Sequence, residues 1–84
     1  MLDMLMVLLY TKEGCGLCEA VKTELARLTA VYPHRLQEID ITQDADLFAR
    51  YRFAIPVVKI GTVTLKAPIT TVHLIHALQT AVCQ

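Results

Sequence analysis

The strongest constraint on the fold is the unbroken apolar run at residues 4–10, MLMVLLY. A run of this kind is typical of a strand that is covered on both faces. It is too short for a membrane helix, which needs about 20 apolar residues, and Asp3 interrupts the apolar residues before it. The polar residues TKEG follow it and indicate a turn. We therefore predict that the domain begins with a buried strand.

Segments with helical periodicity alternate with further strand-like runs along the rest of the chain. From residue 15 to about residue 30, apolar residues recur every three or four positions and predict a helix with one buried face. That face comprises Leu17, Val21, Leu25, Leu28 and Tyr32. The remaining pattern predicts strands at 35–41, 55–60 and 62–66 and helices at 44–51 and 69–82.

The predicted order is therefore β-α-β-α-β-β-α, in a single domain over residues 1–84. Strands that alternate with helices imply a parallel pair joined by a right-handed crossover, and the closing hairpin adds antiparallel strands. We expect a four-stranded mixed sheet with helices on both faces. In the last helix we expect Val72, Ile75, Leu78 and Val82 on the apolar side, with Thr70 or Thr71 as the N-cap.

Composition and charge narrow the classes of function. Eight basic residues balance eight acidic ones, so no net field attracts nucleic acid or an anionic membrane. A signal peptide would show a basic segment and a small-residue cleavage site, and the N-terminus has neither. Three cysteines do not suit the paired disulfides of a secreted framework. We expect a soluble monomer in a reducing, cytoplasmic compartment.

Two cysteines, Cys15 and Cys18, form a CxxC motif directly after the first strand. Such a motif serves metal binding, structural cross-linking or redox exchange. Cys15 falls at the start of the predicted helix, where unpaired N–H groups and the helix dipole stabilise an anion. With Lys12 nearby, we expect the pKa of the Cys15 thiol to lie below its ordinary value of roughly 8.5. Cys18, one turn later and more buried, is within disulfide reach and is expected to act second.

The element order, the CxxC at the start of the first helix and Ile55-Pro56 at the third strand resemble the thioredoxin fold. The segment YTKEGCGLC resembles the YTKPGCPYC-type motif of glutaredoxins, and nearly the whole chain is similar to short bacterial glutaredoxin-like proteins. The resemblance implies a thioredoxin-like α/β fold and a thiol–disulfide oxidoreductase with Cys15 and Cys18 as catalytic residues. It also implies that Pro56 is cis and faces the first cysteine, and that the Ile55 backbone pairs with an extended substrate.

The same resemblance bears on the substrate. Lys12 matches the family's lysine near the glycyl carboxylate of glutathione, Tyr10 matches its strand-end tyrosine, and Thr70 lies where the last helix starts. Three segments differ from the glutaredoxin pattern. Ala54-Ile55-Pro56 stands in place of Thr-Val-Pro, Leu17 in place of an aromatic residue, and LKAPITT in place of Gly-Gly…Asp. We expect no bound cofactor, glutathione at most as a co-substrate, and better exchange with protein disulfides than with glutathione mixed disulfides. These residues do not identify the reductant.

Binding of copper or zinc by the CxxC thiolates is the alternative function. Heavy-metal-associated domains also place CxxC between a first strand and a first helix. They differ in having Met two positions before the first cysteine, where this chain has Glu13, and in their β-α-β-β-α-β order. A structural zinc would need two more ligands, and the candidates are His73, His76 and Cys83. We expect both histidines at the surface and no catalytic role for Cys83.

Overall fold

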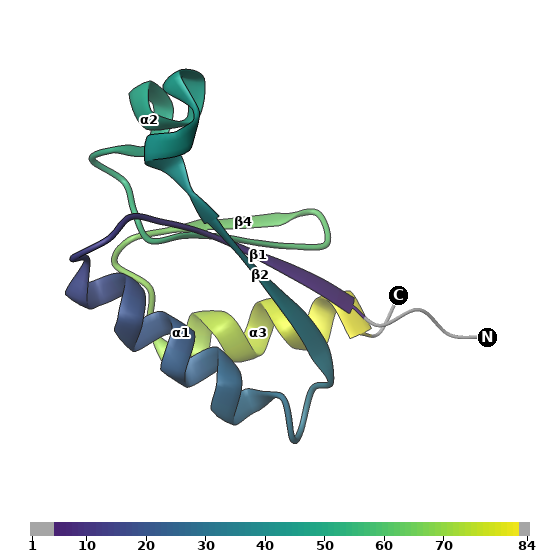
Figure 1. Ribbon diagram of the computed structural model, residues 1–84. Helices are drawn as coiled ribbons and strands as arrows, with labels where there is room; N and C mark the ends of the chain where they lie inside the picture. Colours follow the sequence, from purple (N-terminus) through teal and green to yellow (C-terminus); the bar gives the residue numbers. More distant parts are fainter. Residues whose placement is uncertain (1–4, 83–84) are drawn as a thin grey trace.

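The elements follow the predicted order in the computed structural model, which describes residues 5–82 (Figure 1). They are β1 (Leu5–Thr11), α1 (Gly16–Leu28), β2 (His34–Asp40), the 3₁₀ turn η1 (Ile41–Gln43), α2 (Ala45–Tyr51), β3 (Val57–Ile60), β4 (Val63–Lys66) and α3 (Thr71–Val82). The 3₁₀ turn is the one addition to the prediction. Met4 and Cys83, which entered the predictions above, lie outside the described residues, and so does the side chain of Val82.

The four strands form one mixed sheet in the order β2-β1-β3-β4. β1 pairs in parallel with β2, and the pairs β1–β3 and β3–β4 are antiparallel. The parallel pair is joined by α1, and the closing hairpin by a turn at Gly61, as predicted. Figure 1 shows α1 and α3 side by side on one face of the sheet and α2 on the opposite face. The predicted four-stranded mixed α/β sheet with helices on both faces is therefore confirmed.

The main core lies between the sheet and the pair α1 and α3. Val7 and Leu9 of β1 point toward these helices and are fully buried. They pack with buried residues of the other elements, namely Val21, Leu25, Leu28, Val58, Ile60, Leu74, Ala77 and Leu78. Because this cluster joins β1, β3, α1 and α3, it fixes the start of α1 relative to the sheet.

A smaller core lies on the opposite face, under α2. It contains Tyr10, Ile41, Tyr51 and Val57. In Figure 1, α2 lies over one end of the sheet only. Met6, on the same face of β1 but nearer its other end, is 44% exposed. The prediction that the first strand is covered on both faces is therefore wrong at Met6 and right near Tyr10.

In each long helix, one side chain that the periodicity predicts to be buried is exposed instead. Leu17 is 66% exposed, and Cys18 is buried in its place. Val72 is also exposed, because Leu74 and Leu78, four residues apart, set the buried face of α3. A short apolar stretch can satisfy two overlapping helical stripes, and packing against the sheet selects one. None of the helices between residues 5 and 82 is long and apolar enough to cross a membrane.

Local hydrogen bonds move two strand boundaries from their predicted positions. β2 ends at Asp40 because its carboxylate accepts the N–H of Thr42 at 2.9 Å and turns the chain into η1. β3 begins at Val57 because the N–H of Ile55 is already donated to the Tyr51 carbonyl at 3.1 Å. The next residue, Pro56, has no N–H to give to a sheet.

The burial of Leu25 predicts how strongly α1 depends on its contact with the sheet. Leu25→Ala should lower the free energy of unfolding by about 2–5 kcal/mol, since it opens a cavity at a fully buried site. Leu17→Ala, on the same helix but mostly exposed, should change it by less than about 0.5 kcal/mol. Urea unfolding of both variants under oxidising conditions measures the difference. Equal losses would contradict the packing described here.

Candidate active site

The junction between β1 and α1 places Cys15 at the start of a helix. Gly14 has φ +82°, a conformation that other residues rarely adopt, and it turns the chain out of the strand. Cys15 follows in an extended conformation and is the N-cap of α1. Its sulfur accepts the N–H of Cys18 at 3.2 Å. The helix amide thus points at the sulfur, as an N-cap requires.

The two cysteines differ in exposure, and they are joined by a disulfide. Their Cα atoms are 5.2 Å apart, within the window of about 4.4–6.8 Å that a disulfide accepts. Cys18 is 1% exposed and packs under the helix, whereas Cys15 is partly exposed. The predicted arrangement, with an accessible first cysteine and a buried second one, is therefore found.

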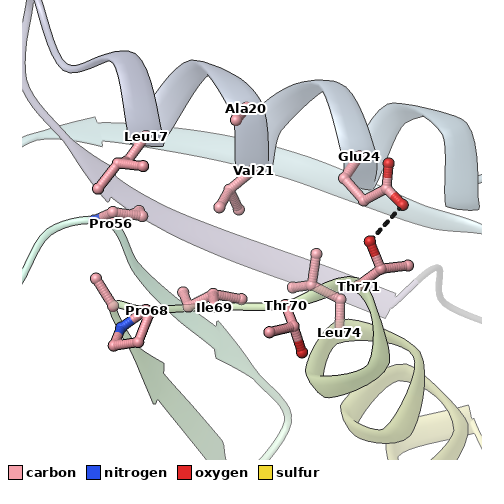
Figure 2. Close-up of a pocket in the computed structure, with 11 residues that line it drawn as sticks. Leu17, Ala20, Val21, Glu24, Pro56, Pro68, Ile69, Thr70, Thr71 and Leu74 are labelled. Carbon is pink, nitrogen blue, oxygen red and sulfur yellow. Dashed lines mark hydrogen bonds between the residues drawn. The ribbon is translucent and has the colours of Figure 1, made fainter.

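An apolar groove of about 390 Å³ begins at Leu17, which lies between the two cysteines in the sequence, and follows α1 toward the start of α3. Figure 2 shows Leu17 and Pro56 facing each other at one end and Glu24 and Thr71 at the other. The other lining residues are Ala20, Val21, Ala67, Pro68, Ile69, Thr70 and Leu74. The Ile55–Pro56 bond is cis, as the resemblance implied, and so is Ala67–Pro68. Pro56 and Thr70 thus line one groove.

Side chains at the start of α3 accept hydrogen bonds from the backbone N–H groups there. The Thr70 hydroxyl accepts the N–H of His73 at 3.2 Å, and the His73 ring nitrogen Nδ1 accepts the N–H of Thr70 at 3.3 Å. This is the reciprocal arrangement of a capping box, with histidine in the place of the usual glutamate. Of the two caps predicted from the sequence, Thr70 is the one found.

Glu24 is a groove residue that the sequence analysis missed. The Thr71 hydroxyl donates to its Oε1 at 2.8 Å, and Arg27 donates to both oxygens, at 2.8 and 3.0 Å. The hydrogen bonds from Arg27, and then that from Thr71, lower the pKa of Glu24 from 4.5 to about 2. An available signal was its spacing, since residue 24 lies three positions after Val21 and four before Leu28, on the predicted buried face.

Lys12 and Tyr10 lie away from this groove. Lys12 is exposed beside a shallow cavity on the β2 side of α1, which it shares with Thr11, Glu13, Glu19, Glu38 and Asp40. Tyr10 is buried on the α2 face, where its ring centroid lies 4.9 Å from that of Tyr51. The structure therefore separates the predicted substrate residues into three places, and the roles of Lys12 and Tyr10 in binding stay predictions.

Ile55 needs a more specific correction. It packs in the small core under α2, and its N–H donates a hydrogen bond to the Tyr51 carbonyl. The expectation that both of its backbone groups pair with an extended substrate is therefore wrong for the N–H. Its carbonyl is the group that stays a candidate.

Metal ligands are sparse around the two cysteines. Within residues 5–82, no three His, Cys, Asp or Glu side chains are grouped so that they could hold a metal ion. His73 and His76 are exposed on α3, as expected. Cys83, the remaining candidate ligand, lies outside the described part of the chain.

Comparison with known proteins identifies the family of this chain. Residues 6–81 match the family described as glutaredoxin-like domain (DUF836). The chain belongs to this family. Among curated proteins, none matches the chain. The glutaredoxin-like assignment and the disulfide between Cys15 and Cys18 together support a redox role in thiol–disulfide chemistry.

Solved structures similar to this glutaredoxin-like domain, a thioredoxin among them, confirm the predicted thioredoxin-like fold. The target protein XcR50 from X. campestris is 25% identical, with a TM-score of 0.77, and the match covers 89% of this chain and 97% of that one. Protein Ne2328 from Nitrosomonas europaea is 22% identical, with a TM-score of 0.75 and coverage of 90% and 93%. Mitochondrial thioredoxin 3 from Saccharomyces cerevisiae, in its oxidised form, is 19% identical, with a TM-score of 0.71 and coverage of 93% and 79%.

The contacts of Glu24 predict a specific pH dependence. Because its pKa is lowered in the folded protein, its contribution to stability is present above pH 4.5 and is lost as the pH falls toward about 2. Removing a donor with Thr71→Val should raise the pKa of Glu24 toward its ordinary value. The carboxyl carbon shift in an NMR titration measures this.

The matched control is Thr64→Val, which makes the same change at an exposed position on β4. It should leave the pKa of Glu24 at about 2. If Thr71→Val also leaves it there, the hydrogen bond between α1 and α3 does not hold the carboxylate.

Proposed function

We propose that this protein is a thiol–disulfide oxidoreductase that reduces disulfides of polypeptides, with Cys15 as the nucleophile and Cys18 as the resolving thiol. The observation that carries this proposal is the pairing of a partly exposed cysteine at a helix N-terminus with a buried one a turn later. A thiolate is the attacking species in disulfide exchange, and a helix N-terminus favours it. The hydrogen bond from the Cys18 N–H to the Cys15 sulfur supports this assignment.

The proposed reaction has two exchange steps. The Cys15 thiolate attacks one sulfur of the substrate disulfide, the S–S bond breaks, and the other substrate sulfur leaves as a thiolate. Cys18 then loses its proton and attacks the Cys15 sulfur, which releases the second substrate thiolate. Two electrons have moved to the substrate, and the protein holds the Cys15–Cys18 disulfide. An external thiol reductant must return the protein to the dithiol.

Three features favour a polypeptide over glutathione as the substrate. Lys12 and Thr70, which would contact the two ends of glutathione, line different cavities. The Thr70 hydroxyl is engaged with the His73 N–H, and the Thr71 hydroxyl with Glu24. Leu17, beside the catalytic pair, presents an exposed apolar side chain of the kind that a protein partner can cover. We therefore propose that glutathione mixed disulfides are poor substrates.

Serine variants separate the roles of the two cysteines. Cys15→Ser should reduce the exchange with insulin disulfides to the uncatalysed background, because a hydroxyl does not replace the thiolate. Cys18→Ser should complete the first step and accumulate a covalent adduct of Cys15 with an insulin chain, seen by intact mass. Cys83→Ser is the matched control and should exchange as the unmodified protein does.

Two outcomes would contradict the proposal. If both Cys15→Ser and Cys18→Ser retain full exchange, the CxxC motif is not the active site. If the reduced protein is instead purified with stoichiometric zinc or copper and loses its fold on chelation, metal binding by the CxxC thiolates is the better account.

A further inference from the structure

The groove beside the catalytic pair has one apolar end and one charged end. Its walls near Leu17 and Pro56 are apolar, and Val21 and Leu74 continue them toward α3 (Figure 2). Among the described residues that line it, Glu24 is the one with a formal charge. Glu24 follows Cys15 by nine positions on α1, which at 1.5 Å per residue places it about 13 Å further along the helix.

The charge at this end is fixed in place and faces the groove. The hydrogen bond from Thr71 ties the Glu24 carboxylate to α3 (Figure 2). Its ion-pair partner Arg27 lies outside the groove lining, with its side chain 67% exposed, whereas the Glu24 side chain is 21% exposed. Arg27 partly neutralises Glu24 through two hydrogen bonds, but it does so from outside the groove, so the charged group that a bound segment meets in the groove is the carboxylate.

We propose that this groove binds an extended segment of the substrate polypeptide, and that Glu24 selects a segment with lysine or arginine about four residues from its cysteine. An extended chain advances about 3.3 Å per residue, so four residues span the distance from Cys15 to Glu24. The methylene stem of such a side chain fits the apolar wall while its cationic head reaches the carboxylate. An aspartate or glutamate at that place is disfavoured by repulsion. This inference rests on the proposed function and assigns its substrate selectivity.

Peptide disulfides test the selectivity directly. The probes are peptides Cys-Ala-Leu-Ala-Xaa and Xaa-Ala-Leu-Ala-Cys, with Xaa lysine, glutamine or glutamate, each activated as a mixed disulfide with thionitrobenzoate. The full-length Cys18→Ser protein attacks the peptide sulfur through Cys15, forms the Cys15–peptide disulfide and releases thionitrobenzoate, whose absorbance gives the rate. In at least one of the two series, the lysine peptide should react about fivefold faster than the glutamate peptide at low salt, and less so at high salt.

Variants in the Cys18→Ser background assign this preference to Glu24. Glu24→Gln keeps an acceptor for the Thr71 hydroxyl but removes the charge, so the lysine-to-glutamate ratio should fall toward one. Glu19→Gln removes an acid from the other side of α1, beside Lys12, and should keep the ratio. Arg27→Gln removes the guanidinium that partly neutralises Glu24 and should raise the lysine-to-glutamate ratio, which tests Glu24 if Glu24→Gln fails to fold. An unchanged ratio in this variant contradicts the selectivity.

The outcomes distinguish this inference from the proposed function. Release that depends on Cys15 but shows no lysine preference in either series contradicts the selectivity alone. A preference that survives in a folded Glu24→Gln protein also contradicts it. Release that is equally fast when Cys15 is replaced by serine contradicts the proposed function itself.

Discussion

The hydrogen bond from the Cys18 N–H to the Cys15 sulfur depends on where α1 begins relative to the sheet. Gly14 turns the chain at the end of β1, and the core residues Val21 and Leu25 hold the helix against Val7 and Leu9. The same packing buries Cys18 and leaves Cys15 at the surface. The difference in exposure between two identical side chains is thus a consequence of one strand–helix junction and the core beneath it.

The two long helices also build the surface next to that junction. Because α1 and α3 lie side by side, Leu17 and Pro56 form one end of the groove, and the bond between Glu24 and Thr71 closes the other. Thr70 and His73 cap the N-terminal turn of α3 by hydrogen bonds to each other. With both threonine hydroxyls engaged and a carboxylate at one end, the groove offers little to a small anionic ligand. Its apolar wall and its carboxylate suit a chain segment that carries a cationic side chain.

The sequence predicts the order of elements, the mixed sheet and the relative exposure of Cys15 and Cys18. These follow from apolar periodicity and from the position of CxxC after a strand, which are local features. Leu17 and Val72 were misplaced because two overlapping apolar stripes are compatible with each helix, and only contact with the sheet selects one. Glu24 was missed for a related reason. Its partner Thr71 lies on another helix, and no local pattern shows that pairing.

Residue roles that depend on distance in three dimensions were the least predictable. Lys12, Tyr10 and Thr70 are near the motif or the last helix in sequence, yet they lie beside a cavity on the β2 side of α1, in the small core under α2, and in the groove. The N–H of Ile55 was expected to be open to substrate, but the turn after α2 uses it. Such contacts depend on how the chain is arranged in three dimensions, and apolar periodicity carries no information about them.

The most direct test of the account is the order in which the cysteines of the fully reduced protein react with iodoacetamide at neutral pH. Digestion after Lys12 and Lys22 releases residues 13–22, and fragmentation of this peptide assigns the label to either cysteine. The account predicts that Cys15 is labelled first, well before Cys18 and Cys83, because Cys15 is partly exposed at a helix N-terminus whereas Cys18 is buried. Labelling of Cys18 or Cys83 before Cys15 would contradict it.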